Sequence, residues 1–386
     1  MNKVKLSVPH NCYLILTANC NMRCLHCYGS YGCDIPKNEL SGDEWINVIK
    51  DLSSNGIFFV NISGGEPTVH KDFKKIIESL VKNEMYFMLT TNGLFNNKIK
   101  QAIIDAKDYV LGIQISLDGP DWLSHGYLRK DCNGNSSKDI FDTTLNNIVD
   151  LIGENIRVSI ATCLHKENIR KIDELKKMIL KIKPSNWSLS TISISGRARE
   201  NDYLYISEST LPNSYWLKLK NDCLEKNIEV NFIDMPNILK DNESSKIYYE
   251  CPAAKWFCEI YSDGSTTPCP LSRVNTFDRN IKWDNIREMD IKHIWDGVPF
   301  DSFRKYQKIG CEGCTAIDKC DRCPPQSIQW FNDPLMPPPY CIENGKNLCL
   351  KDLDKLKRKL EIAKKKNGRY DYGIKEDKDD IFKKIC

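Results

Sequence analysis

Residues 57–67 read IFFVNISGGEP, and this stretch decides the fold. Residues 57–62 are apolar or β-branched apart from one asparagine, which is typical of a buried strand. Residues 63–67 then form a turn rich in glycine and proline. In parallel α/β architectures the loops after the strands leave the same edge of the sheet, and ligand sites form there. The stretch therefore predicts one β–α unit whose loop faces a site.

The same alternation of strand and helix extends over residues 11–195. Short apolar runs predict strands at 12–16, 57–62, 85–90, 109–117, 156–164 and 187–194. Helical periodicity occurs at 44–52, 73–81, 140–152 and 169–182. Ser41 followed by Glu44 predicts a capping box at the start of the first helix. Regular alternation predicts a parallel sheet with right-handed crossovers, arranged as an open doubly wound sheet or an incomplete barrel.

Beyond residue 199 the alternation stops, and the chain divides into further segments. Residues 201–250 have the composition of loop and mixed helix, and residues 251–345 are dense in cysteine. Residues 346–386 form a Lys-rich tail whose leucines predict a solvated amphipathic helix packed on the body. These leucines are Leu350, Leu353, Leu356 and Leu360. We therefore expect an α/β domain over 1–200, a bridging segment over 201–250, a cysteine-rich domain over 251–345 and the tail.

Composition limits the class of protein. The chain has 386 residues, 41% hydrophobic and 28% charged, which excludes a largely disordered protein and favours more than one domain. A formal net charge of +3 leaves no electrostatic footprint for nucleic acid. No apolar run approaches the roughly 18 residues that span a bilayer, and residues 1–10 do not resemble a signal peptide. We expect a cytoplasmic protein, in which 18 cysteines indicate bound metal.

The candidate metal ligands begin directly after the first predicted strand. Cys20, Cys24 and Cys27 are spaced as C-x3-C-x2-C on one short loop. Three thiolates can hold three irons of a [4Fe–4S] cluster and leave the fourth iron for an outside ligand. Zinc is the competing metal, with His26 as the nearest further ligand, although its place beside Cys27 makes chelation awkward.

Three more loops leave the same predicted edge of the sheet. They contain the Gly-Gly turn at 63–67, a Thr-Asn-Gly turn at 91–93 and a Ser-Leu-Asp-Gly turn at 116–119. Each alone could be an ordinary turn, because Gly, Pro, Asn and Asp dominate turns. Together with the cysteine loop, four such loops in register predict one cavity that binds a ligand.

The cysteine loop after the first strand and Gly-Gly-Glu-Pro after the second resemble the radical S-adenosylmethionine (SAM) enzymes. The resemblance covers residues 1–200 and implies a partial (β/α)6 barrel of the TIM type, open at one side. In that family three cysteines bind a [4Fe–4S] cluster, and SAM chelates its fourth iron. The resemblance therefore implies that Cys20, Cys24 and Cys27 are the catalytic cluster's ligands.

The resemblance also implies the residues that contact SAM. His125 and Arg129 are similar to an H-D-x-x-R segment of the family, although Gly126 stands where that segment has Asp. The implied SAM contacts are Gly64, Gly65, Glu66, Pro67, Asn92, Ser116, Asp118 and Arg129. The implied reaction is one-electron cleavage of SAM into methionine and a 5′-deoxyadenosyl radical, which abstracts hydrogen from a substrate. The cofactor supplies this chemistry, and the protein supplies position and potential.

The second half carries eight further candidate ligands. They are Cys251, Cys258, Cys269, Cys311, Cys314, Cys320, Cys323 and Cys341. Eight thiolates suffice for two four-thiolate sites, and spacing alone does not separate iron–sulfur clusters from structural zinc.

The order of these cysteines resembles the SPASM extension of radical SAM enzymes, which holds two auxiliary [4Fe–4S] clusters. The resemblance implies one cluster on Cys251, Cys258, Cys269 and Cys323 and another on Cys311, Cys314, Cys320 and Cys341. The family has three residues between the last two cysteines of its quartet, whereas only Asp321 and Arg322 intervene here. The sequence Ser-Gly-Arg-Ala at 195–198 also matches a segment common before this extension.

Enzymes with this extension mostly modify peptides or proteins. The resemblance therefore implies a ribosomally made peptide, or a protein side chain, as the substrate for crosslinking or oxidation. Residues 1–10 leave no room for a leader-binding module before the first strand, so we expect any leader to be held by a separate protein, by the tail, or not at all. A flavodoxin-like or ferredoxin-like electron donor is the other expected partner, and neither nucleic acid nor membrane is expected.

Three alternatives remain open. A small-molecule radical SAM enzyme of haem-like cofactor or metabolite synthesis would also lack the leader-binding module. A sulfatase-type formylglycine maturase would carry an acidic residue beside an auxiliary-cluster cysteine, where this chain has Pro270 after Cys269. A non-catalytic iron–sulfur or zinc scaffold would bind metal without cleaving SAM.

Overall fold

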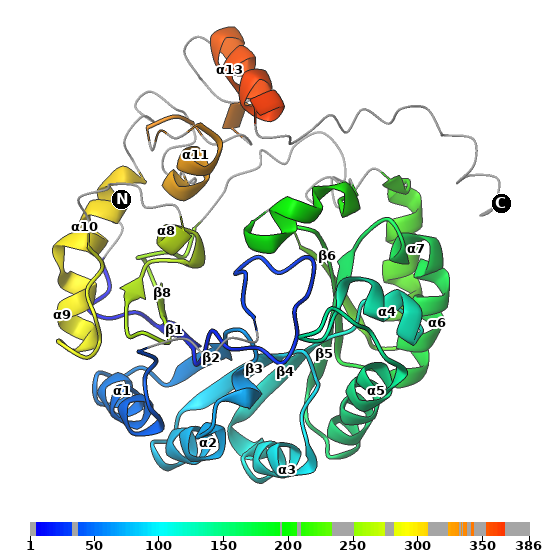
Figure 1. Cartoon of the computed structure of the whole chain (residues 1–386). Coiled ribbons are helices and arrows are strands. Elements are labelled where there is room, and N and C mark those ends of the chain that lie inside the picture. The colour runs from blue at the N-terminus through cyan, green and yellow to red at the C-terminus, as the bar shows by residue number, and fades with distance from the viewer. Residues whose placement is uncertain are drawn as a thin grey trace.

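Strands β1 to β9 form one continuous sheet (Figure 1). The computed structural model describes residues 5–32, 38–193, 195–206, 210–233, 251–274, 282–307, 323–331, 333, 335–337, 341–342 and 353–366. The strands are β1 (Asn11–Ile15), β2 (Phe59–Ser63), β3 (Tyr86–Thr91), β4 (Val110–Ser116), β5 (Val158–Leu164), β6 (Asn186–Thr191), β7 (Glu229–Ile233), β8 (Phe257–Ile260) and β9 (Thr266–Thr267). Their order is β7-β6-β5-β4-β3-β2-β1-β8-β9, and every neighbouring pair is parallel except β8 and β9.

Helices α1, α2, α3, α5 and α6 follow the strands in sequence and line the outside of the curved sheet (Figure 1). The α-helices are α1 (Gly42–Ser54), α2 (Phe73–Lys82), α3 (Asn97–Asp105), α4 (Trp122–Leu128), α5 (Lys138–Gly153), α6 (Ile172–Ile182), α7 (Asn213–Leu224), α8 (Pro270–Val274), α9 (Ile291–Asp296), α10 (Val298–Tyr306), α11 (Pro324–Phe331) and α13 (Leu353–Lys366). The short 3-10 helices are η1 (Pro67–Val69), η2 (Lys107–Tyr109), η3 (Asn168–Lys171) and η4 (Gly196–Leu204). Within the ranges given above, no helix is long and apolar enough to cross a bilayer.

The main hydrophobic core lies between the sheet and these outer helices. Alternation along β1 places the fully buried Cys12 and Leu14 in this core, together with Ile62 of β2 and Trp45 of α1. The Trp45 indole N–H also donates to the Leu16 carbonyl at 3.2 Å. Burial of each large apolar side chain stabilises the fold by about 1.5–3 kcal/mol, so this layer fixes the strands and hence the loops at their ends.

The predicted fold class is confirmed. A strand lies in each of the six predicted runs, parallel to its neighbours, and the helices expected at 44–52, 73–81, 140–152 and 169–182 are present. The capping box also forms, because Ser41 and Glu44 each accept a hydrogen bond from the other's backbone N–H.

The segment expected to be loop and mixed helix contains the helix α7 and also adds a strand to the sheet. After α7 the chain forms β7, which pairs in parallel with β6. Val230 is buried while Glu229 and Asn231 are exposed, so β7 has the alternation of a strand with one covered face. The sequence of β7 is too short for its periodicity to distinguish a strand from a loop. It becomes a strand because β6 would otherwise leave its backbone N–H and C=O groups unpaired at an edge.

The cysteine-rich segment extends the opposite edge of the sheet. Strand β8 pairs in parallel with β1, and β9 then pairs antiparallel with β8. The first and second halves of the chain therefore share one sheet. The predicted tail helix is present as α13, which packs on α11 and buries Leu360. Leu350 lies outside the described residues.

One exposed ion pair connects the two halves and gives a pH-dependent prediction. Arg287 Nε donates to Glu44 Oε1 at 2.7 Å, and Ser41 N donates to Glu44 Oε2 at 2.7 Å. The Arg287 hydrogen bond, followed by that from Ser41, lowers the pKa of Glu44 to about 2. The carboxylate therefore stabilises the fold fully above pH 4.5, and this contribution disappears as the pH falls towards 2.

We expect Glu44→Gln to lower the free energy of unfolding by about 1 kcal/mol at pH 7, because it weakens both the cap and the ion pair. The effect is modest since the Glu44 side chain is 39% exposed. Urea unfolding at pH 7 and pH 3 measures it, with Asp43→Asn, an exposed change on the same first turn, as the control. Equal effects of the two substitutions at pH 7 would contradict the role of Glu44.

Candidate functional site

The cysteine loop joins β1 to the segment before α1 and lies across the carboxyl ends of the strands (Figure 1). Backbone hydrogen bonds hold it along its length. Cys20 N donates to Gly32 O at 2.7 Å, and Leu25 N donates to Leu128 O at 2.8 Å. Arg197 N donates to Cys27 O at 2.9 Å from the end of the barrel beyond β6. The three predicted cluster ligands therefore stand on a loop that the surrounding barrel positions.

The thiols of Cys20, Cys24 and Cys27 are unbonded to other sulfurs. Cys20 is 8% exposed, and its sulfur accepts a hydrogen bond from Met22 N at 3.4 Å. Burial raises the pKa of the Cys20 thiol to about 12 and also raises that of Cys24, where the Arg129 charge acts in the opposite direction. A dry pocket with sulfur ligands, an N–H donor to sulfur and a nearby cation fits an iron–sulfur cluster.

These donors are not arranged around a single ion. Among the residues with described positions, no three His, Cys, Asp or Glu side chains converge closely enough to share one metal ion. Each cysteine of a cubane cluster binds a different iron, so a [4Fe–4S] cluster does not require such convergence.

The Gly-Gly turn after β2 lies directly against the cysteine loop. Gly65 N donates to Thr17 O at 2.8 Å, and Glu66 N donates to Asn19 O at 2.9 Å. A Cβ atom on Gly65 would lie 2.3 Å from Asn19 O. Gly64 has φ +140°, and a Cβ there would lie 2.5 Å from Thr17 O. Both glycines are therefore required for this close backbone contact, which fixes the start of the cysteine loop.

The Glu66 side chain connects the turn after β2 to the turn after β3. It is 1% exposed, and its Oε1 accepts hydrogen bonds from the Thr68 hydroxyl at 2.6 Å and the Thr91 hydroxyl at 2.7 Å. Its Oε2 accepts from Asn92 N at 2.7 Å. Protein donors therefore engage both carboxylate oxygens, and the following Pro67 begins the buried start of η1.

Asn92 continues this network to the cysteine loop. Its side-chain nitrogen donates to Asn21 Oδ1 at 2.7 Å, and its Oδ1 accepts from Leu94 N at 2.8 Å. Asn21 in turn donates to Leu94 O at 2.9 Å. The loop after β3 and the cysteine loop are thus joined through paired amides, a contact that the sequence does not predict.

Asp118 and Arg129 form a buried ion pair after β4. Arg129 Nε donates to Asp118 Oδ2 at 2.7 Å, and the two side chains are 10% and 0% exposed. Cys163 N of β5 donates to Asp118 Oδ1 at 2.8 Å. His26 Nε2 lies 4.0 Å from Asp118 Oδ2. Burial alone would raise the pKa of Asp118, but the Arg129 guanidinium and then His26 outweigh it and lower this pKa to about 2. Asp118 is therefore charged and places a guanidinium beneath the cysteine loop.

Gly126 stands where the related family segment has Asp, and packing explains this difference. A Cβ atom at this position would lie 2.4 Å from the Ser136 Cβ, so the chain has no room for the family's Asp. His125 and Arg129 nevertheless stay in place, since Asp118 N donates to His125 Nδ1 at 3.2 Å. Ser116, the last residue of β4, is half-buried beside this group.

Arg197 is a site residue that sequence reasoning did not identify. Its guanidinium donates to Cys24 O at 2.7 Å and to Tyr31 O at 2.5 Å, which ties the middle of the cysteine loop to its later part. Gly196 has φ +53°, and a Cβ there would lie 2.3 Å from Tyr28 O. The Ser-Gly-Arg-Ala segment that contains Arg197 matches a segment common in related chains. That match did not indicate that Arg197 contacts the cysteine loop.

Two family profiles match this arrangement. Residues 14–179 match the radical SAM superfamily, and residues 251–324 match SPASM, an iron–sulfur cluster-binding domain. The chain is a radical SAM enzyme with a SPASM domain. Its cofactors are accordingly SAM and a [4Fe–4S] cluster in the first domain and auxiliary iron–sulfur clusters in the second.

Individual relatives are similar over most of the chain. Mycofactocin maturase MftC of Mycolicibacterium smegmatis is 26% identical over 337 residues, which cover 85% of this chain and 81% of the relative. The AdoMet-dependent heme synthase of Methanosarcina barkeri is 25% identical over 353 residues, covering 85% and 94%. Streptococcus suis SuiB bound to S-adenosylmethionine has a TM-score of 0.66 at 18% identity, covering 86% and 76%, and so shares the fold.

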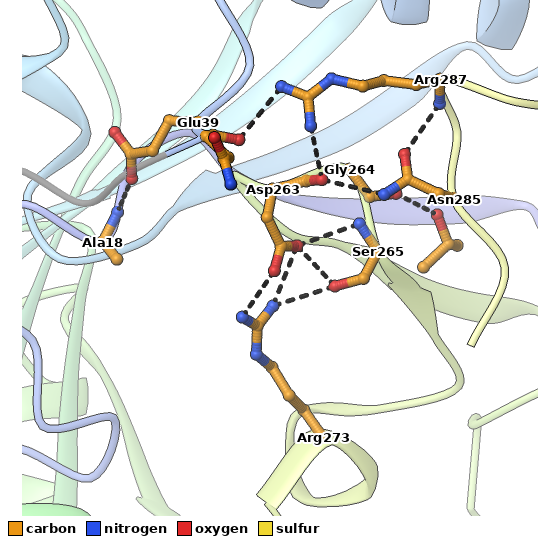
Figure 2. Close-up of polar contacts among 10 residues, drawn as sticks. Ala18, Glu39, Asp263, Gly264, Ser265, Arg273, Asn285 and Arg287 are labelled. Carbon is orange, nitrogen blue, oxygen red and sulfur yellow. Dashed lines mark hydrogen bonds and ion pairs between the residues drawn. The ribbon is translucent and has the colours of Figure 1, made fainter. Parts of the chain in front are cut away.

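A turn at 263–265 of the SPASM domain is held by residues of the same domain (Figure 2). Asp263 accepts hydrogen bonds from Ser265 N at 3.0 Å and from Arg273 Nη2 at 2.8 Å. The Asp263 carbonyl accepts from Asn285 at 2.9 Å and from Arg287 Nη1 at 2.8 Å. These contacts make the turn and the segment leading to α9 one rigid unit.

The same unit reaches the start of the cysteine loop. Arg287 Nη2 donates to Asn38 O at 3.1 Å, and Leu40 N donates to Ser262 O at 2.5 Å. Glu39, between these two residues, accepts from Ala18 N at 2.6 Å and from the Thr17 hydroxyl at 2.8 Å (Figure 2). The SPASM turn therefore contributes to the position of the cysteine loop.

A cavity of about 550 Å³ lies between the cysteine loop and the SPASM domain. Tyr28, Tyr31 and Arg197 line it from the first domain, and Tyr261 and Arg273 line it from the second. Arg273 stacks 3.9 Å above the Tyr261 ring. The cavity combines aromatic faces with cationic groups, which suits a polar substrate of moderate size.

Five of the eight predicted SPASM ligands lie in the described part of the chain. Cys311, Cys314 and Cys320 lie outside it. Cys251, Cys258, Cys323 and Cys341 are buried, and Cys269 is half-buried. Cys269 packs against the Ser272 hydroxyl at 3.1 Å, whereas the Cys258 sulfur lies 3.4 Å from that of Cys12.

Because the close backbone contact fixes the cysteine loop, we expect Gly65→Ala to displace it. The variant should lose about four iron atoms per chain after anaerobic reconstitution, since one cubane cluster loses its site. Iron and sulfide analysis measures this loss. Gly153→Ala is the matched control, because a Cβ there meets nothing within 4 Å. Wild-type iron content in a folded Gly65→Ala protein would contradict the role of this contact.

Proposed function

We propose that this enzyme cleaves SAM reductively at a [4Fe–4S] cluster held by Cys20, Cys24 and Cys27, and uses the radical to abstract hydrogen from a peptide or protein. The loop supplies three sulfur ligands on a scaffold braced from β2, β4 and β6. This brace is the observation that supports the proposal most strongly. When bound, the reduced cluster and SAM supply one-electron cleavage that gives methionine and a 5′-deoxyadenosyl radical.

Some residues of the chain would contact SAM, and others would position the groups that do. Gly64 and Gly65 bring a side-chain-free backbone edge to the cluster loop, and we assign this edge to the amino group of SAM. Glu66 serves as a positioning residue, because Thr68, Thr91 and Asn92 engage its carboxylate.

Polar groups after β3 and β4 complete the proposed SAM site. Asp118 holds the Arg129 guanidinium near Cys24, where its positive charge offsets the negative charge of bound thiolates. We assign Ser116 and Asn92 to the polar wall beside SAM and Pro67 to the rigid end of the Gly-Gly turn.

The SPASM cysteines supply the auxiliary clusters. We propose two such clusters, since eight cysteines lie between residues 251 and 341. We also propose domain boundaries near residues 200, 250 and 345 and a cytoplasmic location. The proposed partners are a flavodoxin-like or ferredoxin-like electron donor and a separate protein that binds the leader peptide.

A peptide or protein is the preferred substrate class. MftC is a mycofactocin maturase by name, and a SuiB structure of the same fold is bound to its precursor peptide SuiA. The cavity between the two domains offers about 550 Å³ with polar and aromatic walls, which suits one or two amino-acid side chains. A small-molecule substrate is the second candidate, because the AdoMet-dependent heme synthase matches over 94% of its own length.

The test is 5′-deoxyadenosine formation from SAM, measured by liquid chromatography under anaerobic conditions with dithionite and reconstituted iron and sulfide. We expect product from the wild type and a loss of at least about 100-fold in the variant with Cys20, Cys24 and Cys27 changed to Ala, since the cleavage needs this cluster. Cys223→Ala, at a core thiol on α7, is the matched control.

Substrates are compared in the same assay. Stimulation by a short peptide encoded beside this gene would support the peptide class, and stimulation by a purified porphyrin-type metabolite would support the second candidate. Full iron loading without any SAM binding would contradict the enzymatic proposal and favour a scaffold.

A further inference from the structure

The cavity between the cysteine loop and the SPASM domain has a lining of one sign of charge. Arg23, Arg197 and Arg273 line it, and no Asp or Glu is among the described residues that do. The three loop cysteines and the residues assigned to SAM are also absent from this described lining. The cavity is therefore separate from the groups that would hold the cluster and SAM, and its positive charge attracts an anionic ligand.

A protein carboxylate already neutralises Arg273. Its Nη2 donates to Asp263 Oδ2 at 2.8 Å and its Nη1 donates to Asp263 Oδ1 at 3.2 Å (Figure 2). The guanidinium also stacks on the Tyr261 ring. Arg273 therefore shapes the wall on the SPASM side and adds little net charge to the cavity.

Arg197 has no such counter-charge. Its two terminal nitrogens donate to the backbone carbonyls of Cys24 and Tyr31, which carry no net charge. No Asp or Glu of the described chain forms an ion pair with it. Arg197 is thus a fixed cation on the cavity wall, because two carbonyls hold its guanidinium and no protein carboxylate neutralises it.

Arg23 is the exposed cation of the cavity. Its backbone N–H donates to Lys130 O at 2.7 Å, which fixes the main chain at this point of the cysteine loop. Its guanidinium has no hydrogen-bond or ion-pair partner within the described part of the chain. An unpaired guanidinium offers a planar fork of N–H donors that matches a carboxylate in a bidentate pair.

Aromatic rings form the wall between these cations. Tyr28 follows Cys27 directly and is 42% exposed. Its ring meets the Tyr31 ring edge to face, with the ring centroids 6.1 Å apart. Arginine beside tyrosine is the combination that contributes most to binding at protein interfaces. The lining therefore suits an anionic group carried by a partly apolar ligand.

We propose that this cavity binds a carboxylate of the substrate, with Arg23 as its bidentate partner and Arg197 as a second, fixed positive charge. In a peptide made of ordinary amino acids, this carboxylate belongs to an acidic side chain or to the C-terminus. Arg23 and Arg197 then select an acidic substrate over a neutral or basic one. This inference rests on the proposed function for the presence of a substrate.

Chemical modification tests the anion site without a substrate. Phenylglyoxal modifies accessible arginines, and mass spectrometry of the iron-loaded enzyme gives the rate at each position. We expect an excess of N-acetylglutamate α-amide, which carries one carboxylate, to slow the modification of Arg23 at least about threefold. The uncharged N-acetylglutamine amide should have no effect.

Arg199 is the matched control for this measurement. It is exposed, lies two residues after Arg197 and is absent from the cavity lining, so both compounds should leave its rate unchanged. Equal modification of Arg23 in the two compounds would overturn the proposal.

Substituted peptides then identify the source of the carboxylate. The peptide encoded beside the gene is compared in the SAM-cleavage assay with versions in which each Asp or Glu is changed to its amide, or the C-terminus is amidated. We expect one of these changes to raise the KM at least about tenfold for the wild type, which corresponds to one lost charge-assisted pair. The same change should alter the KM less than about twofold for Arg23→Gln, because the pair is already absent.

Arg199→Gln should keep the preference of the wild type, and iron analysis of Arg23→Gln establishes that its cluster loop is intact. Equal effects of each peptide change on the wild type and on Arg23→Gln would overturn the role of Arg23. Stimulation by a porphyrin-type metabolite alone would overturn the peptide class, and the same comparison would then use its propionates and their methyl esters. Absent SAM cleavage would overturn the proposed function alone, since the modification of Arg23 is measured without turnover.

Discussion

The structure depends on one backbone contact, between the Gly-Gly turn after β2 and the first residues of the cysteine loop. Gly65 N and Glu66 N donate to Thr17 O and Asn19 O, at a separation that no side chain at Gly65 would allow. The contact extends the parallel pairing of β1 and β2 beyond the sheet. It thereby turns an irregular loop into a continuation of a rigid element, which a preorganised metal site requires.

Charged and polar side chains then hold the rest of the loop. Glu66 joins the turns after β2 and β3, and the Asp118–Arg129 pair places a cation near Cys24. Arg197 closes the loop from the side of β6. Since each group acts on the backbone or on a neighbouring side chain, the thiols stay available for metal. The SPASM turn adds a fifth support through residues 38–40.

Sequence reasoning identified the parts of the site that are local. The Ser41–Glu44 cap, the strands before each polar loop and the three loop cysteines all follow from periodicity and spacing, and the structure places them as expected. It did not identify β7, Arg197 or the orientation of Cys258. These depend on which strand edges lie open and on register between segments more than 150 residues apart, such as β1 and β8, which spacing along the chain does not encode.

The most direct test of the central claim, that the loop cluster binds SAM through an open iron, is electron paramagnetic resonance of the reduced, fully loaded enzyme with and without SAM. We expect SAM to change the g-values of one cluster and to leave the auxiliary signals unchanged, because three cysteines on the loop would leave one iron of their cluster without a protein ligand. Identical spectra at saturating SAM would contradict it.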